Sequence, residues 1–171
     1  DVDSSARALV NAAGGVETNT LNCVQVELVG TCDPATHKKW VDRGVKHIFW
    51  PEAPEWALLA FARLVRWLGD EHGVKMQCTA KWVAYPASYG KGNGVRLTAG
   101  QWLDYYGWLG HCHVPENLHG DPGLFPMARV LVMARTKAWN ETDAKSETKT
   151  LEQRVAALEA AVTKILKADA S

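Results

Sequence analysis

Hydrophobic and polar residues alternate along residues 23–29, which read C-V-Q-V-E-L-V. Three aliphatic residues fall on one face of this segment, and Gln25 and Glu27 fall on the other. A period of two is typical of a β-strand with one apolar face. The pattern therefore predicts a strand that ends at Gly30, with Glu27 near its end on the polar face.

The spacing lengthens to that of a helix over residues 51–73. Apolar residues there recur three or four positions apart, and charged residues share another face, which is typical of an amphipathic helix. Prolines near the beginning and glycines near the end are the residues that commonly flank a helix. The residues predicted to form its apolar face are Trp56, Ala60, Leu64 and Trp67.

A long loop and two further helices are predicted beyond this segment. Residues 83–96 contain one proline and three glycines, a composition that favours a loop. Thr98 is a suitable N-cap for a short helix that extends to about Tyr105. Pro126 is a good first-turn residue for another helix, which runs toward Lys137.

The composition changes at Ala138, so residues 1–137 are predicted to form one domain. Residues 138–150 are polar and charged and are predicted to be a linker. Over residues 151–168 apolar residues recur at intervals of four and three, which predicts an amphipathic or coiled-coil helix. Residues 151–166 would then form a homo-oligomer, or a lone helix that leads to a further domain.

Composition and charge exclude several classes of function. The 19 basic residues balance the 19 acidic residues, so no basic field argues for a nucleic acid or an anionic membrane as a partner. No apolar run approaches the roughly 20 residues that membrane insertion by a helix requires. The four cysteines are scattered, which favours synthesis in a reducing, intracellular compartment.

The candidate chemistry is concentrated in residues 111–121, which contain three of the six histidines and an aspartate. Proline and glycine interrupt this stretch, so its side chains are predicted to project from a loop. Imidazoles together with a carboxylate suit a catalytic zinc ion better than a structural one. The competing interpretation is a set of ordinary surface or hydrogen-bonded histidines, and Cys112 is an alternative ligand.

The stretch 111–123 resembles the second metal-binding segment of type 2 N-acetylmuramoyl-L-alanine amidases, the family related to peptidoglycan recognition proteins. In that segment a histidine is followed, after nine residues, by Asp-Pro-Gly, and here these are His111 and Asp121-Pro122-Gly123. The segment V-Q-V-E-L-V-G is similar to the family's I-G-I-E-L-E-G strand, whose glutamate faces the zinc. Glu27 occupies that position. The likeness covers residues 1 to about 135.

The resemblance implies an α/β fold, with a central mixed β-sheet flanked by helices, present here as a partial domain followed by a C-terminal helix. It also implies that His111 and Asp121 bind Zn²⁺ and that Glu27 acts as the catalytic base. Where many members have a lysine that stabilises the oxyanion, this chain has His119. The implied substrate is the amide bond between N-acetylmuramic acid and L-alanine in peptidoglycan.

Further similarities point to the branch of the family found in endolysins of bacteriophages that infect mycobacteria and their relatives. For such an endolysin, the implied location is the host cytoplasm until lysis and then the cell wall. The segments that are similar to this branch are residues 5–9, 14–19 and 85–90.

One departure from the family concerns its first zinc ligand, a histidine on an early strand. No histidine precedes His37 in this chain. The resemblance therefore implies either the later part of a longer amidase domain or a fragment with an incomplete site. An incomplete site would favour a peptidoglycan-binding module without catalysis. The residues that could substitute for the missing ligand are His37, His47, His72 and His113.

Overall fold

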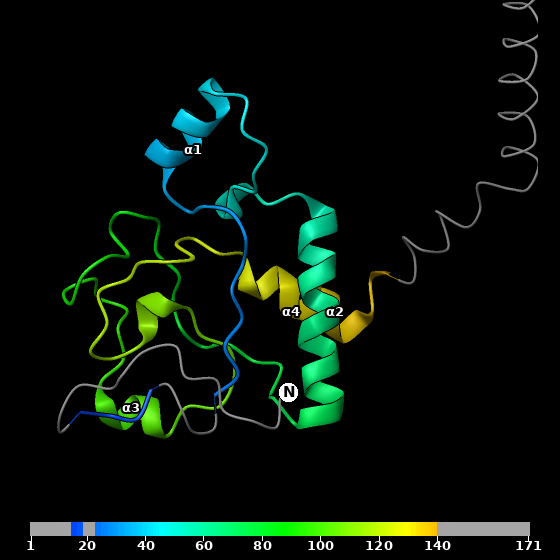
Figure 1. Ribbon diagram of the computed structural model, residues 1–171. Helices are drawn as coiled ribbons and strands as arrows, with labels where there is room; N and C mark the ends of the chain where they lie inside the picture. The colour runs from blue at the N-terminus through cyan, green and yellow to red at the C-terminus, as the bar shows by residue number, and fades with distance from the viewer. Residues whose placement is uncertain (1–14, 19–22, 140–171) are drawn as a thin grey trace, which may run out of the picture. The chain divides into compact units, whose positions relative to one another are not determined.

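The computed structural model describes residues 15–18 and 23–139 of the chain (Figure 1). The described residues up to Arg135 belong to one compact unit, and the description below concerns that unit. The predicted linker lies almost wholly outside the described residues. The predicted helix over 151–168, and with it the oligomerisation through 151–166, lies entirely outside them.

The predicted helix over residues 51–73 is present as α2 (Glu55–His72), the longest described helix. Gly73 ends it in the left-handed region at φ 69°, where a residue without a Cβ avoids strain. The predicted apolar face was wrong, because Trp56 and Trp67 remain 64% and 45% exposed. The helix instead buries a neighbouring stripe of equal period: Ala57, Leu58, Leu59, Phe61, Ala62, Val65 and Leu68.

Both interpretations of α2 satisfy the helical period, so periodicity alone could not choose between them. The tryptophans have more apolar surface, but the buried stripe consists of small and aliphatic side chains around Phe61, which pack closely against neighbouring elements. The side that packs is decided by tertiary contacts, which the spacing within one helix does not contain.

The helix predicted near Pro126 is present as α4 (Met127–Thr136). It buries five residues, and Figure 1 shows it crossing behind α2. An ion pair of 3.2 Å between Arg129 and Glu55 joins the exposed sides of the two helices. The buried residues of α4 are Met127, Val130, Leu131, Met133 and Ala134.

Two short helices have strong N-caps. In α3 (Ala99–Leu103), Thr98 and Gln101 form the reciprocal bonds of a capping box, as the predicted cap at Thr98 required. The sequence analysis did not anticipate α1 (Pro34–Asp42), although its N-cap Asp33 accepts two backbone N–H groups and Pro34 occupies the first turn.

The predicted α/β fold with a central mixed β-sheet was wrong for the described residues, which are helical with extended connections. Their one bridge joins Thr31 and Phe49 in parallel. It consists of hydrogen bonds from Thr31 N–H to Ile48 O at 2.9 Å and from Trp50 N–H to Thr31 O at 3.0 Å. Residues 23–29 form no regular strand. A segment with this alternation becomes a strand only where a second segment pairs with it along its length. The bridge nearby, at Thr31, lies after residues 23–29 and involves one residue of each segment.

Aromatic rings join α2 to the extended connections. Phe125 lies 5.6 Å from the ring of Phe61 and 5.6 Å from that of Trp82, and 5.7 Å from Trp50 in η1 (Trp50–Glu52). Phe61 also meets Trp108 edge-on at 5.5 Å. These aromatic contacts, rather than a sheet, form the core against which the extended connections pack. Among the described helices, none combines the length and apolar character needed to cross a bilayer.

Candidate metal centre

The candidate ligands lie on a loop whose two ends are held together by a backbone hydrogen bond. It begins with η2 (His111–His113), a single 3-10 turn, and continues without regular structure to Asp121. The N–H of Cys112 donates to the carbonyl of Asp121 at 3.1 Å. This bond explains how residues ten positions apart in sequence come to have adjacent side chains.

Three side chains of this loop, His111, His119 and Asp121, offer ligand atoms within 4.8 Å of one another. His111 Nδ1 lies 3.0 Å from Asp121 Oδ2, and His119 Nδ1 lies 3.6 Å from Asp121 Oδ1. The two imidazole centroids are 5.0 Å apart. All three side chains are exposed, so a ligand can approach them from solvent.

The group has the electrostatics of a histidine–carboxylate pair. The hydrogen bond with Asp121 raises the pKa of His111, against the opposing effect of burial. Burial by itself would raise the pKa of Asp121, but the hydrogen bond and charge of His111 outweigh it, so this pKa is lowered. The carboxylate therefore stays ionised at neutral pH, as a metal ligand must.

The charge of Glu27 acts on His111 through space. Glu27 projects from the extended segment 23–29, and its charge contributes to raising the pKa of His111. Its side chain is exposed rather than buried. The structure thus brings together His111, His119 and Asp121, whereas Glu27 acts on His111 through its charge alone, and the sheet expected to support Glu27 is absent from the described residues.

The geometry favours for His119 the role of metal ligand that the histidine cluster suggested, over the oxyanion role that the family resemblance implied. His119 was predicted to donate a hydrogen bond to an oxyanion, yet its ring nitrogen belongs to the group of possible ligands. The signal available in the sequence was the spacing His119-x-Asp121, which places two donor side chains on neighbouring positions of one loop. The family likeness assigned His119 to the oxyanion role instead of the ligand set.

The four histidines considered as substitutes for a missing ligand do not join this group. His113 is fully buried: its Nδ1 accepts from Gly110 N–H at 2.8 Å, so its Nε2 donates to Lys81 O at 2.8 Å. His37 and His47 pair with each other, with His37 Nδ1 2.7 Å from His47 Nε2. His72 meets Trp67 edge-on at 4.9 Å.

Cys112, the alternative ligand, also points elsewhere. Its sulfur is buried beside the ring of His113 at 3.7 Å, and burial raises its pKa to about 12. A neutral thiol in such a place behaves as a small apolar side chain.

Two imidazole nitrogens and one carboxylate oxygen fit a divalent transition metal. This donor set is typical of catalytic zinc sites, in which a further coordination position stays open. Zn–N and Zn–O bonds of about 2.1 Å place neighbouring ligand atoms about 3.4 Å apart in a tetrahedron. The contacts of 3.0 and 3.6 Å, which are made to the two different oxygens of Asp121, lie close to that separation. The described residues therefore include a group able to hold a metal ion.

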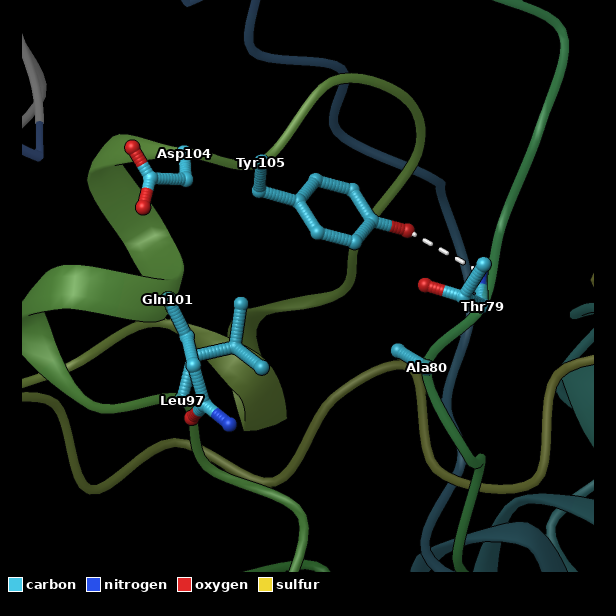
Figure 2. A pocket seen from close by; sticks show the side chains of 6 residues that line it. All are labelled: Thr79, Ala80, Leu97, Gln101, Asp104 and Tyr105. Carbon is cyan, nitrogen blue, oxygen red and sulfur yellow. Dashed lines mark hydrogen bonds between the residues drawn. The ribbon is translucent and has the colours of Figure 1, made fainter.

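A separate pocket of about 460 Å³ lies beside α3 (Figure 2). The hydroxyl of Tyr105 accepts a hydrogen bond from the N–H of Thr79 across its side, at 3.2 Å. None of the possible metal ligands lines this pocket, so we assign it no part in metal chemistry. Its lining residues are Thr79, Ala80, Leu97, Gln101, Asp104 and Tyr105.

In comparisons with protein families, curated proteins and solved structures, the chain matches none of them.

Proposed function

We propose that this protein is a zinc-dependent hydrolase that cleaves the amide bond between N-acetylmuramic acid and L-alanine in peptidoglycan. The observation that supports a hydrolytic metal site is the convergence of His111, His119 and Asp121, whose ligand atoms lie within 4.8 Å of one another. The substrate is inferred from the sequence likeness of residues 111–123 and 24–30 to type 2 amidases.

In this proposal His111, His119 and Asp121 hold the metal ion. A bound Zn²⁺ would supply Lewis acidity, which polarises a carbonyl oxygen and acidifies water. Glu27 accepts the proton of the attacking water and then delivers it to the leaving amine, as general base followed by general acid. Its exposed position leaves the carboxylate free to make both transfers.

The distance of His119 from Asp121 supports a role as a metal ligand. A ring nitrogen 3.6 Å from the carboxylate oxygen suits a shared metal ion, which then also polarises the carbonyl. As a ligand, His119 supplies the third protein donor that the sequence analysis found missing. The case for a peptidoglycan-binding module without catalysis rested on that missing donor, so we favour the enzyme.

As an endolysin of a phage that infects mycobacteria or their relatives, the protein would accumulate in the host cytoplasm and act on the cell wall at lysis. This location follows from the proposed substrate and from the same likeness. Purified walls of mycobacteria are accordingly the first substrate to test.

Metal content tests the ligand set. We expect one zinc ion per chain by elemental analysis, and at least a tenfold weaker zinc affinity in His111→Ala, His119→Ala and Asp121→Ala, because each removes one donor. His72→Ala, on α2, is the matched control and keeps full affinity. Full zinc affinity in His119→Ala, together with slower turnover, would return His119 to the oxyanion role.

Muropeptide release tests the reaction. We expect Glu27→Gln to keep its zinc and its affinity for walls while the rate of release falls by about 10²- to 10⁴-fold, the usual contribution of a general base. Chromatography of digested walls should reveal free stem peptides that begin with L-alanine. Wall binding by the zinc-loaded wild type without any release would instead establish the binding module.

A further inference from the structure

Arg96 is bonded through all five of its side-chain N–H groups. Nε and Nη2 donate to the carbonyl of Gly90 at 3.2 and 3.0 Å, and Nη2 also donates to the carbonyl of His119 at 3.1 Å. Nη1 donates to the carbonyls of His111 and Val114, at 3.1 and 2.6 Å. The acceptors are the backbone carbonyls of Gly90, His111, Val114 and His119.

The carbonyls of the two histidine ligands are therefore held by one guanidinium. His111 and His119 are the first and last residues of the segment 111–119, and Val114 lies within it. Gly90 anchors the guanidinium to the preceding loop, so the contact joins two parts of the chain rather than neighbours in one turn.

The segment around Arg96 holds further carbonyls of the same loop. Asn93 Nδ2 donates to Cys112 O at 2.8 Å, and its Oδ1 accepts from Arg96 N–H at 2.9 Å, which fixes the start of the arginine side chain. Leu97 N–H donates to His113 O at 2.9 Å, and Gly90 N–H donates to Leu118 O at 2.8 Å. Residues 90–97 thus act as a template along which the ligand loop lies.

We propose that Arg96 is a positioning residue for the metal centre, which sets the separation of His111 and His119 by binding their carbonyls. The proposal rests on the function proposed above, because it concerns the ligands of that site. A loop without regular secondary structure has no repeating series of internal backbone hydrogen bonds to fix its shape. The hydrogen bonds of Arg96 to four backbone carbonyls take the place of that series.

Only a guanidinium can make this arrangement. Its planar fork places five donors in fixed directions, whereas the ammonium of lysine has three donors on one atom. A lysine at position 96 keeps the positive charge but reaches fewer of the four carbonyls. If charge alone mattered, Arg96→Lys would behave like the wild type, so this substitution separates geometry from electrostatics.

Zinc affinity measured by competition with a chromophoric chelator is the first test. We expect Arg96→Lys and Arg96→Ala to bind zinc about 10- to 100-fold more weakly, the usual effect of disturbing the groups that orient metal ligands. Ethylguanidinium added to Arg96→Ala should restore part of the affinity. Arg66→Lys, on α2 and paired with Asp70 at 2.6 Å, is the matched control and should be unchanged.

NMR relaxation of the metal-free protein is the second test and does not depend on zinc. We expect the order parameters of residues 111–119 to fall in Arg96→Lys from about 0.85, typical of rigid backbone, toward about 0.6, while those of α2 stay constant. If Arg96→Ala does not fold, the lysine variant decides.

The two tests distinguish the failure of each proposal. Wild-type zinc affinity in a folded Arg96→Lys variant would overturn the positioning role and leave the metal site intact. If the wild type binds no zinc, the proposed function fails. Unchanged order parameters in the lysine variant would then overturn the positioning role as well, and a drop confined to residues 111–119 would support it.

Discussion

At the residue scale, three histidines of one loop occupy two different environments. His111 and His119 are exposed beside Asp121, while His113 is fully buried and its ring meets Trp82 edge-on at 4.7 Å. In the sequence, His111 and Asp121 matched a family motif, and His119 stood where many members of that family have a lysine. The sequence analysis could not identify His113 as a core residue, because its burial depends on Lys81 and Trp82, which are distant in sequence.

His113 should contribute to stability through its two hydrogen bonds rather than through chemistry. His113→Phe leaves the N–H of Gly110 and the carbonyl of Lys81 without their partner, so we expect a loss of about 1–3 kcal/mol for each group. Urea unfolding measures the difference. His113→Gln keeps one donor and one acceptor and should lose less. A phenylalanine variant as stable as the wild type would contradict the assignment.

At the element scale, local chemistry predicted helix ends better than it predicted packing. The cap at Thr98 and the helix after Pro126 were confirmed, because capping depends on residues that adjoin in sequence. The strand at residues 23–29 and the apolar face of α2 were wrong. Both depend on what lies opposite an element, which alternation and periodicity do not contain.

The N-cap of α1 gives a prediction with a defined pH dependence. Thr36 and the N–H groups at the start of α1 bind the Asp33 carboxylate and lower its pKa. This contribution is therefore fully present above the unfolded pKa of about 3.9 and is lost as pH falls through the lower, folded pKa. We expect Asp33→Ala to cost about 1 kcal/mol at neutral pH.

The difference between Asp33→Ala and the wild type should shrink in acid when thermal unfolding is followed at several pH values. Asp33→Asn is the control, since its amide oxygen still accepts the backbone N–H groups but does not titrate. A penalty for Asp33→Ala that stays constant down to the lowest pH would show that the carboxylate charge plays no part.

At the scale of the whole described unit, the aromatic cluster around Phe125 takes the place of the sheet that the family likeness implied. It joins α2, η1 and the loop of Trp82 through rings 5.6 to 5.7 Å apart. The eight tryptophans of the chain favour a large aromatic core, but they do not specify which rings meet. The rings that meet come from segments distant in sequence, and no local pattern pairs them.

Truncation of Phe125 tests this arrangement. Phe125→Ala removes a ring that is only 3% exposed, so we expect a loss of about 3–5 kcal/mol in the free energy of unfolding. Leu103→Ala, at an exposed position on α3, is the control and should stay within about 0.5 kcal/mol of the wild type. Similar losses in the two variants would mean that the cluster is not the core.

The ligand atoms of the metal group all come from one short stretch of chain, which lies outside the helices that bury the core. Local opening of such a stretch requires far less free energy than global unfolding. Metal exchange would then be governed by excursions of this stretch alone. A chelator could strip the ion from a molecule whose helices remain intact, and reloading would need no refolding.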